Sequence, residues 1–233
     1  MDSVYSYETI EQNLKEITAN INEAYDKYRN DGSEVRIMAV TKTVPPEAVN
    51  SAVKMGIDLL GENRVQEYLS KKDFYDKSAE VHFIGHLQTN KVKYIINEMT
   101  LIQSVDSLRL AEEIDRLSKA NNKIMNVLIE VNIGGEESKS GVSPENLREL
   151  ISGVSALENV RIKGLMTIPP PSESDVFLGR MQELFNKFKS ENISGADMEI
   201  LSMGMTHDYK QAVKYGSTLV RIGTGLFGAR NYR

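Results

Sequence analysis

The sequence contains no cysteine among its 233 residues. Disulfide bonds, thiolate nucleophiles and cysteine metal sites are therefore excluded, which fits a reducing compartment. The sequence also lacks any apolar run near the roughly 18 residues that a membrane-spanning helix needs. Its first residues, MDSVYSYETIEQNLKEI, are polar and amphipathic and do not resemble a signal peptide. We therefore expect a cytoplasmic protein.

Basic residues and histidines are both in short supply. Lys and Arg total 28 against 33 Asp and Glu, a net charge of −5, and the basic residues do not cluster. Binding to nucleic acid or to an anionic membrane through a broad basic face is therefore disfavoured. His82 and His86 lie in the strand-like stretch VHFIGH, without the glutamate of an H-E-x-x-H helix. We therefore expect no metal centre.

One familiar glycine motif is present without its usual context. Gly223, Gly225 and Gly228 spell the G-x-G-x-x-G pattern of dinucleotide-binding turns. Such a site also needs a helix, a second parallel strand and an acidic residue about twenty positions later. The sequence ends at Arg233, which leaves no room for them. We therefore expect these glycines to serve another close approach of the backbone to a ligand or to itself.

The hydrophobic pattern predicts an α/β protein. A helix is expected over residues 6–29, where apolar residues recur at three- and four-residue spacing. Eight apolar runs follow, starting at Val35, Ile57, Val81, Thr100, Ile124, Val160, Met198 and Thr218. Most segments between them have helical patterning, and this alternation implies parallel strands with right-handed crossovers. We expect one domain over residues 1–233, a (β/α)₈ TIM barrel with residues 1–30 as a helix packed on it. An open doubly wound sheet is the alternative.

Many of the apolar runs end in polar residues, which a barrel would gather on the rim where ligands usually bind. These residues are Thr41, Lys42, Glu62, Asn63, His86, Asp106, Asn132, Thr167, Ser202, Arg221 and Thr224. Lys42 is the most informative. Desolvation in a barrel mouth lowers the pKa of a lysine, and its neutral amine can then form an imine with a carbonyl compound. The alternative is a lysine that snorkels at a sheet edge.

The loops after the last two runs favour phosphate binding, as they do in many barrels. Gly204 and Gly223 allow backbone amides to approach a phosphate, and the hydroxyls of Ser202 and Thr224 are further donors. A phosphate cradle and an imine-forming lysine on one rim indicate a phosphorylated aldehyde. Pyridoxal 5′-phosphate (PLP) meets both requirements. A class I aldolase acting on a sugar phosphate also explains the lysine and the cradle.

Several stretches of the chain together resemble the YggS/PROSC family of pyridoxal phosphate homeostasis proteins. They occur in the family's order and spacing: AVTKTVPPEAV, GENRVQE, HFIGHLQTNK, SVDSLRLAEEI, VNIGGEESKSGV, GLMTI, LSMGMTHDY and VRIGTGLFGAR. The resemblance implies a fold-type III PLP barrel, similar to the N-terminal domain of alanine racemase, without that enzyme's second β domain. The chain departs from the family at Val81, where an aromatic residue is usual, and at His207 and Tyr209, near the expected phosphate.

The resemblance also implies a role for individual residues. Lys42 would hold PLP as a Schiff base, and would thus be the modified residue, while Arg221 would face the pyridine nitrogen. The positions that match the family's phosphate-binding residues are Ser202, Gly204, Gly223 and Thr224. The positions that match residues lining the cofactor are Asn63 and Met203.

The function that the resemblance implies is binding. The protein would hold PLP and take part in the homeostasis of PLP and of linked amino and keto acids, without robust turnover. Amino acids and apo PLP enzymes are further expected partners, and we expect a monomer or a weak dimer. The alternative is a racemase-like enzyme. A racemase needs a second acid/base on the other face of the cofactor, which in the two-domain enzymes comes from the partner's β domain.

Overall fold

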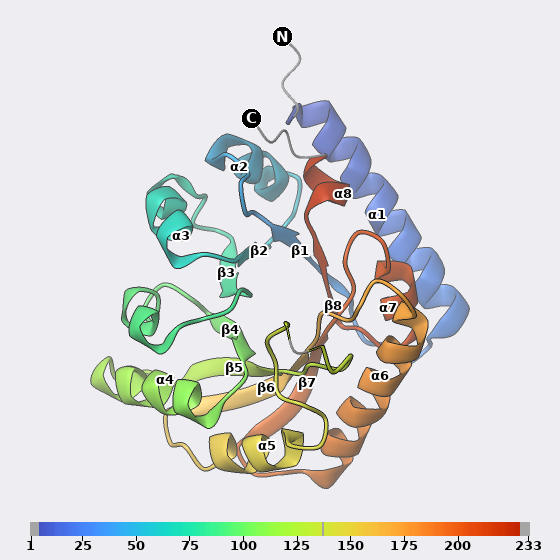
Figure 1. Ribbon diagram of the computed structural model, residues 1–233. Coiled ribbons are helices and arrows are strands. Elements are labelled where there is room, and N and C mark those ends of the chain that lie inside the picture. The colour runs from blue at the N-terminus through green and yellow to red at the C-terminus, as the bar shows by residue number, and fades with distance from the viewer. Residues whose placement is uncertain (1–4, 137, 229–233) are drawn as a thin grey trace.

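Eight parallel strands form a closed barrel in sequence order, as the computed structural model shows (Figure 1). The structure describes residues 5–136 and 138–228. Each predicted apolar run overlaps one strand, and pairing of β1 with β8 closes the barrel, so the barrel prediction is confirmed over the open sheet. The strands are β1 (Arg36–Val40), β2 (Leu59–Glu62), β3 (Glu80–Phe83), β4 (Leu101–Val105), β5 (Met125–Glu130), β6 (Val160–Met166), β7 (Ala196–Ser202) and β8 (Leu219–Ile222).

Helices surround the barrel and bury their apolar faces against it (Figure 1). In α6, for example, Leu178, Met181, Phe185 and Phe188 recur at three- and four-residue spacing and are all buried. The α-helices are α1 (Tyr7–Tyr28), α2 (Pro46–Lys54), α3 (Val65–Lys71), α4 (Leu108–Ala120), α5 (Leu147–Ser155), α6 (Ser174–Glu191), α7 (Tyr209–Lys214) and α8 (Thr224–Phe227). The 3₁₀-helices are η1 (Lys72–Phe74) and η2 (Thr89–Tyr94).

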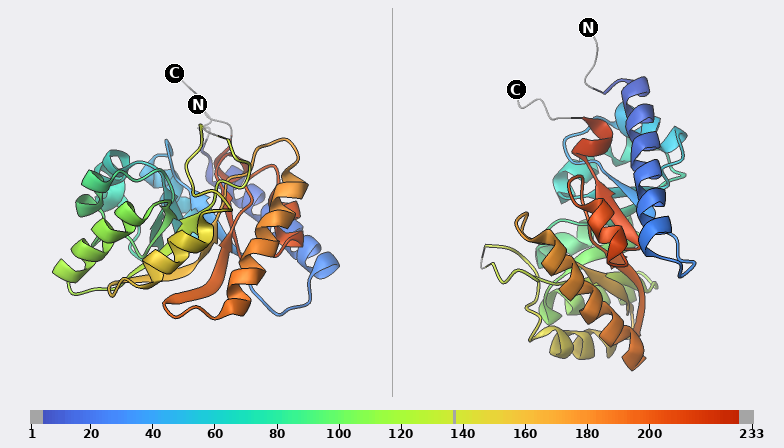
Figure 2. Two further views of the ribbon diagram at one scale, coloured as in Figure 1. Left: turned by 60° about the horizontal axis from the view of Figure 1, so that its bottom comes forward. Right: turned by 90° about the vertical axis from the view of Figure 1, so that its right-hand side faces the viewer.

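The first helix lies along the side of the barrel next to α7 and α8 (Figure 2). Ser6 caps it by accepting a hydrogen bond from the backbone N–H of Thr9. Asn13 donates to the Leu226 carbonyl and Asn20 to the Tyr209 hydroxyl, which ties α1 to the last two helices. The predicted helix over residues 6–29 is thus confirmed to within a residue at each end. Among the helices of the described residues, none is long and apolar enough to cross a membrane.

Alternate residues of each strand face the barrel interior, as the pleat requires. Met38 and Val40 of β1 belong to the small apolar cluster inside the barrel, whereas Ala39 packs into the larger cluster beneath the helices. Gly61 is a glycine for a steric reason, because a Cβ there would lie 2.5 Å from the Met38 sulfur. The inward series Met38 and Val40 leads to Lys42, two residues beyond, at the barrel mouth.

Candidate functional site

A cavity of about 200 Å³ opens at the carboxyl ends of the strands. It brings together five of the predicted cofactor-binding residues, which are Lys42, Asn63, Arg221, Gly223 and Thr224. The remaining lining residues are Val40, Ile84, Ile168, Met205, Thr206 and His207. The cavity therefore combines one amine, one guanidinium, one amide, one imidazole and two threonine hydroxyls with an apolar wall, as is common in sites for small polar molecules.

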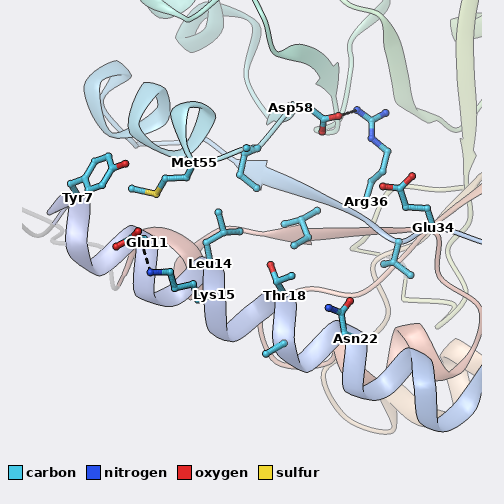
Figure 3. A pocket seen from close by; sticks show the side chains of 15 residues that line it. Tyr7, Glu11, Leu14, Lys15, Thr18, Asn22, Glu34, Arg36, Met55 and Asp58 are labelled. Carbon is cyan, nitrogen blue, oxygen red and sulfur yellow. Dashed lines mark ion pairs between the residues drawn. The ribbon is translucent and has the colours of Figure 1, made fainter.

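A larger groove lies away from this mouth (Figure 3). It has a volume of about 710 Å³ and runs between α1, β1 and the end of α2. Arg36 opens β1 and Asp58 precedes β2, so the groove flanks the amino ends of the strands. Four of its charged residues form ion pairs, with 3.0 Å between Arg36 and Asp58 and 3.1 Å between Lys15 and Glu11. None of the predicted cofactor-binding residues lines this groove.

The loop that carries Lys42 is anchored on both sides of the lysine. Thr41 donates its backbone N–H to the Gly61 carbonyl at 3.1 Å, which extends the pairing of β1 with β2. Thr43 has a left-handed φ of 64°, unfavourable for a β-branched residue, and its N–H donates to the Glu67 carboxylate at 2.5 Å. Lys71 pairs with Glu67 and donates to the Thr41 carbonyl at 3.2 Å. Glu67 and Lys71 of α3 therefore fix the backbone that presents the half-buried Lys42.

Polar residues at the ends of β1 and β2 do not all face the mouth. Thr41 and Tyr75 donate to the same oxygen of the buried Glu62 carboxyl, at 2.7 and 2.5 Å. Burial raises the pKa of Glu62, although the two hydrogen bonds oppose the shift. Lys71 and Tyr75 place this cluster beside α3 and η1, so Thr41 and Glu62 support the loop from outside the barrel.

Arg221 lies at the inner end of the cavity and is 3% exposed. Its guanidinium donates to the Ser202 hydroxyl at 2.6 Å and to the Thr167 carbonyl at 2.7 Å. Burial lowers the pKa of Arg221 to about 10, while the charges of Glu130 and Asp208 oppose the shift. The arginine thus stays protonated at neutral pH, and it supplies a fixed positive charge at this end of the cavity.

Two residues predicted to bind the phosphate, Ser202 and Gly204, and one predicted to line the cofactor, Met203, lie behind the cavity wall. Ser202 and Met203 are fully buried, and the Ser202 hydroxyl donates to Gln103 at 2.7 Å. Gly204 has a left-handed φ of 92°, and a Cβ there would lie 2.5 Å from the Ala212 Cβ. The Gly204 carbonyl accepts from the Arg221 N–H at 3.0 Å. The lining of the cavity does not include Ser202, Met203 or Gly204.

The sequence-based prediction missed Thr206 in the same loop. Thr206 lines the cavity, with its hydroxyl 3.4 Å from that of Thr224, and accepts a hydrogen bond from the Gly225 N–H at 3.1 Å. These two hydroxyls and the adjacent Gly223 form one polar side of the cavity. The signal in the sequence was the position of Thr206 in the loop after the seventh run, four residues beyond Ser202.

A buried carboxyl near the mouth was also missed. Glu130 ends β5 and is 7% exposed. Burial, reinforced by the negative charge of Asp106 and opposed by Arg221, raises the pKa of Glu130 to about 7. A glutamate near the end of the otherwise apolar run IMNVLIEVN was the available signal. At neutral pH this carboxyl exists in both protonation states, close to a permanent cation.

This pKa predicts a pH-dependent effect of Glu130→Gln on the apo protein. Between about pH 4 and pH 7 the folded state keeps a proton that the unfolded chain releases, so stability falls as pH rises through this window. Above pH 7 the buried carboxylate destabilises the fold by roughly 3 kcal/mol at most. We expect Glu130→Gln to raise the free energy of unfolding at pH 8, relative to wild type, more than at pH 4.5.

Denaturant titrations at pH 8 and pH 4.5 measure this difference. The exposed Glu112→Gln is the control, and a pH-independent difference for Glu130→Gln would contradict the assignment.

The two histidines of VHFIGH lie in different environments. His82 is 3% exposed, and burial with the nearby Arg36 lowers its pKa to about 3. The His86 side chain is exposed, and its ring nitrogen lies 3.7 Å from Asp106 and 3.3 Å from the Ser140 hydroxyl. Over residues 5–136 and 138–228, no group of three histidine or acidic side chains could hold a metal ion.

Comparison with known proteins identifies the family. The model of the alanine racemase N-terminal domain matches residues 12–231. A pyridoxal phosphate homeostasis protein of Aquifex aeolicus is 43% identical over 227 residues, covering 95% of this chain and 98% of the relative. PipY of Synechococcus elongatus, whose structure has been solved with PLP bound, is 29% identical with a TM-score of 0.79, over 94% of this chain and all of PipY.

Alanine racemase of Corynebacterium glutamicum shares the fold at 15% identity. Its TM-score is 0.72, and the match covers 96% of this chain but 61% of the racemase. The rest of the racemase lies outside the matched region. Since both the family model and the curated relatives span nearly the whole sequence, the chain belongs to the family of pyridoxal phosphate homeostasis proteins.

Proposed function

We propose that this protein binds PLP reversibly at the barrel mouth, and that it takes part in the homeostasis of PLP and of linked amino and keto acids. The observation that carries the proposal is one cavity that holds Lys42, Arg221 and Thr224 together. When bound, PLP supplies an aldehyde carbon that condenses with a primary amine, with loss of water, and a phosphate dianion. We keep a cytoplasmic location as part of the proposal, because a cysteine-free chain fits a reducing compartment.

The residues around the cavity fit this cofactor. Lys42 supplies the amine that becomes covalently attached. Thr206, Thr224 and the backbone at Gly223 supply hydrogen-bonding groups suited to a phosphate on one side. Among the described residues, Asn63 Oδ1 is buried without a hydrogen-bond partner, which suits a polar group of a ligand.

Arg221 favours binding over catalysis. A guanidinium donates hydrogen bonds and accepts none, so beside the pyridine nitrogen it keeps that nitrogen unprotonated. An unprotonated ring withdraws electrons weakly and gives little support to carbanion chemistry on a bound amino acid. Racemisation would also need a second acid/base, and this chain matches only the barrel part of the racemase. We therefore propose a binding protein that exchanges PLP with amino acids and apo PLP enzymes, without robust turnover.

Amino-acid turnover tests the proposed function. We expect the PLP-loaded protein, incubated with L-alanine and other amino acids in D₂O, to show α-deuteration and D-enantiomer formation near the background of free PLP. Mass spectrometry reports the deuterium and chiral chromatography reports the enantiomer. Sustained turnover of about 1 per second or faster, a normal enzymatic rate, would contradict the binding function and favour a racemase-like enzyme.

A further inference from the structure

A hydrogen-bond chain runs from Arg221 through the barrel interior. The guanidinium donates to the Ser202 hydroxyl at 2.6 Å, and this hydroxyl lies 2.7 Å from Gln103 Oε1. The Gln103 side-chain nitrogen lies 3.0 Å from His82 Nδ1. The four residues come from β8, β7, β4 and β3, and none is more than 3% exposed. The chain thus crosses the barrel from the cavity to its buried core.

The chemistry of the groups gives this chain a single direction. A guanidinium has donors only, so the Ser202 oxygen must accept, and its one proton then goes to Gln103 Oε1. The amide therefore presents its N–H₂ group to His82, whose Nδ1 must accept. It follows that His82 is neutral and carries its proton on Nε2, which faces Glu80 at 3.6 Å. The burial that lowers the pKa of His82 agrees with this neutral state.

We propose that Ser202, Gln103 and His82 are positioning residues that hold the Arg221 guanidinium toward the cofactor ring, and that the Ser202 hydroxyl does not bind the phosphate. The inference rests on the proposed function. Ser202 is fully buried and its proton is committed to Gln103, whereas Thr206 and Thr224 line the cavity. The second guanidinium nitrogen is held by the Thr167 carbonyl at 2.7 Å, so the plane of the group is fixed before a ligand arrives.

Comparing PLP with pyridoxal, which lacks the phosphate, tests this assignment. Each variant is compared with wild type for the same ligand, so intrinsic differences between the two ligands cancel. Because Arg221 would contact the ring and not the phosphate, we expect Ser202→Ala and Gln103→Met to weaken both ligands by the same factor, about tenfold. Thr206→Val should weaken PLP and leave pyridoxal unchanged. If Ser202→Ala weakened the binding of PLP and left the binding of pyridoxal unchanged, the proposal would be overturned.

Ser104→Ala is the matched control. Ser104 follows Gln103 in β4 and is 1% exposed, and among the described residues its hydroxyl has no hydrogen-bond partner. Its removal should leave the affinity for both ligands unchanged. Equal weakening by Ser104→Ala and Ser202→Ala would show a general effect of core packing and would contradict a positioning role.

A second readout uses the wild-type protein without cofactor, so it does not depend on how well the variants fold. In ¹⁵N nuclear magnetic resonance spectra, we expect His82 to be neutral at pH 7 with its proton on Nε2. A proton on Nδ1 would break the chain and overturn the inference. Failure of the proposed function looks different, because wild type would then bind neither PLP nor pyridoxal while the His82 tautomer stayed as expected.

Discussion

Lys42→Ala is expected to lose the visible absorbance of bound PLP and to bind PLP at least about a hundredfold more weakly, close to 3 kcal/mol. The variant retains the lining groups of the cavity but lacks the amine that condenses with the aldehyde. We expect the fold to survive, because the loop is held through the backbone of Thr41 and Thr43, on either side of the lysine. Absorbance titration and circular dichroism measure the two effects.

Two further variants make the result specific. Lys42→Arg keeps the positive charge but removes the primary amine, so it should also lack the visible absorbance. Lys54→Ala, an exposed position at the end of α2, should behave like wild type. Loss of folded structure together with absorbance in Lys42→Ala would mean that the lysine is structural. Retention of the absorbance would mean that another residue carries PLP.

Removing the phosphate from the ligand is expected to have the second-largest effect. Hydrogen bonds to a charged group contribute about 1.5 to 3 kcal/mol each. Two or more from the polar side formed by Thr206, Thr224 and Gly223 would make pyridoxal bind at least about a hundredfold more weakly than PLP. Fluorescence titration with both ligands measures the difference. Equal affinities would remove the phosphate site from the proposal.

The threonine hydroxyls should account for part of this difference. We expect Thr206→Val and Thr224→Val each to weaken PLP by about 1 to 2 kcal/mol, since valine preserves the shape but loses the hydroxyl. Neither change should affect pyridoxal. Thr18→Val, on the exposed surface of α1 beside the groove of Figure 3, is the control. An equal loss with both ligands would place these hydroxyls away from the phosphate.

The fold was predictable because each strand and helix has its own local pattern. Eight short apolar runs alternate with helical segments, which predicts parallel strands, and the closed barrel uses all eight strands in sequence order. The details between elements were less predictable. The segment after β3 forms the 3₁₀-helix η2, and the short α3 continues into η1, because helix length depends on packing that the sequence pattern does not contain.

A residue of the candidate site could be predicted from the sequence when its position in a strand decides which way its side chain points. Lys42 continues the inward series of Met38 and Val40, so a pattern of period two places it at the mouth. The contact between Ser202 and Gln103 was not predictable in this way, because the two residues are 99 positions apart and meet only once β4 and β7 are brought together in the closed barrel. A family motif locates the loop, but the direction of each hydroxyl depends on partners such as these.

Reduction with borohydride tests the central claim most directly. The PLP-loaded wild-type protein is reduced in its native state, digested with a protease and analysed by mass spectrometry. Attachment of PLP to the amine at the mouth predicts one phosphopyridoxyl group on the peptide that contains Lys42, and none on that peptide when PLP is omitted. A label found instead on another lysine, such as Lys71 or Lys139, would contradict the account.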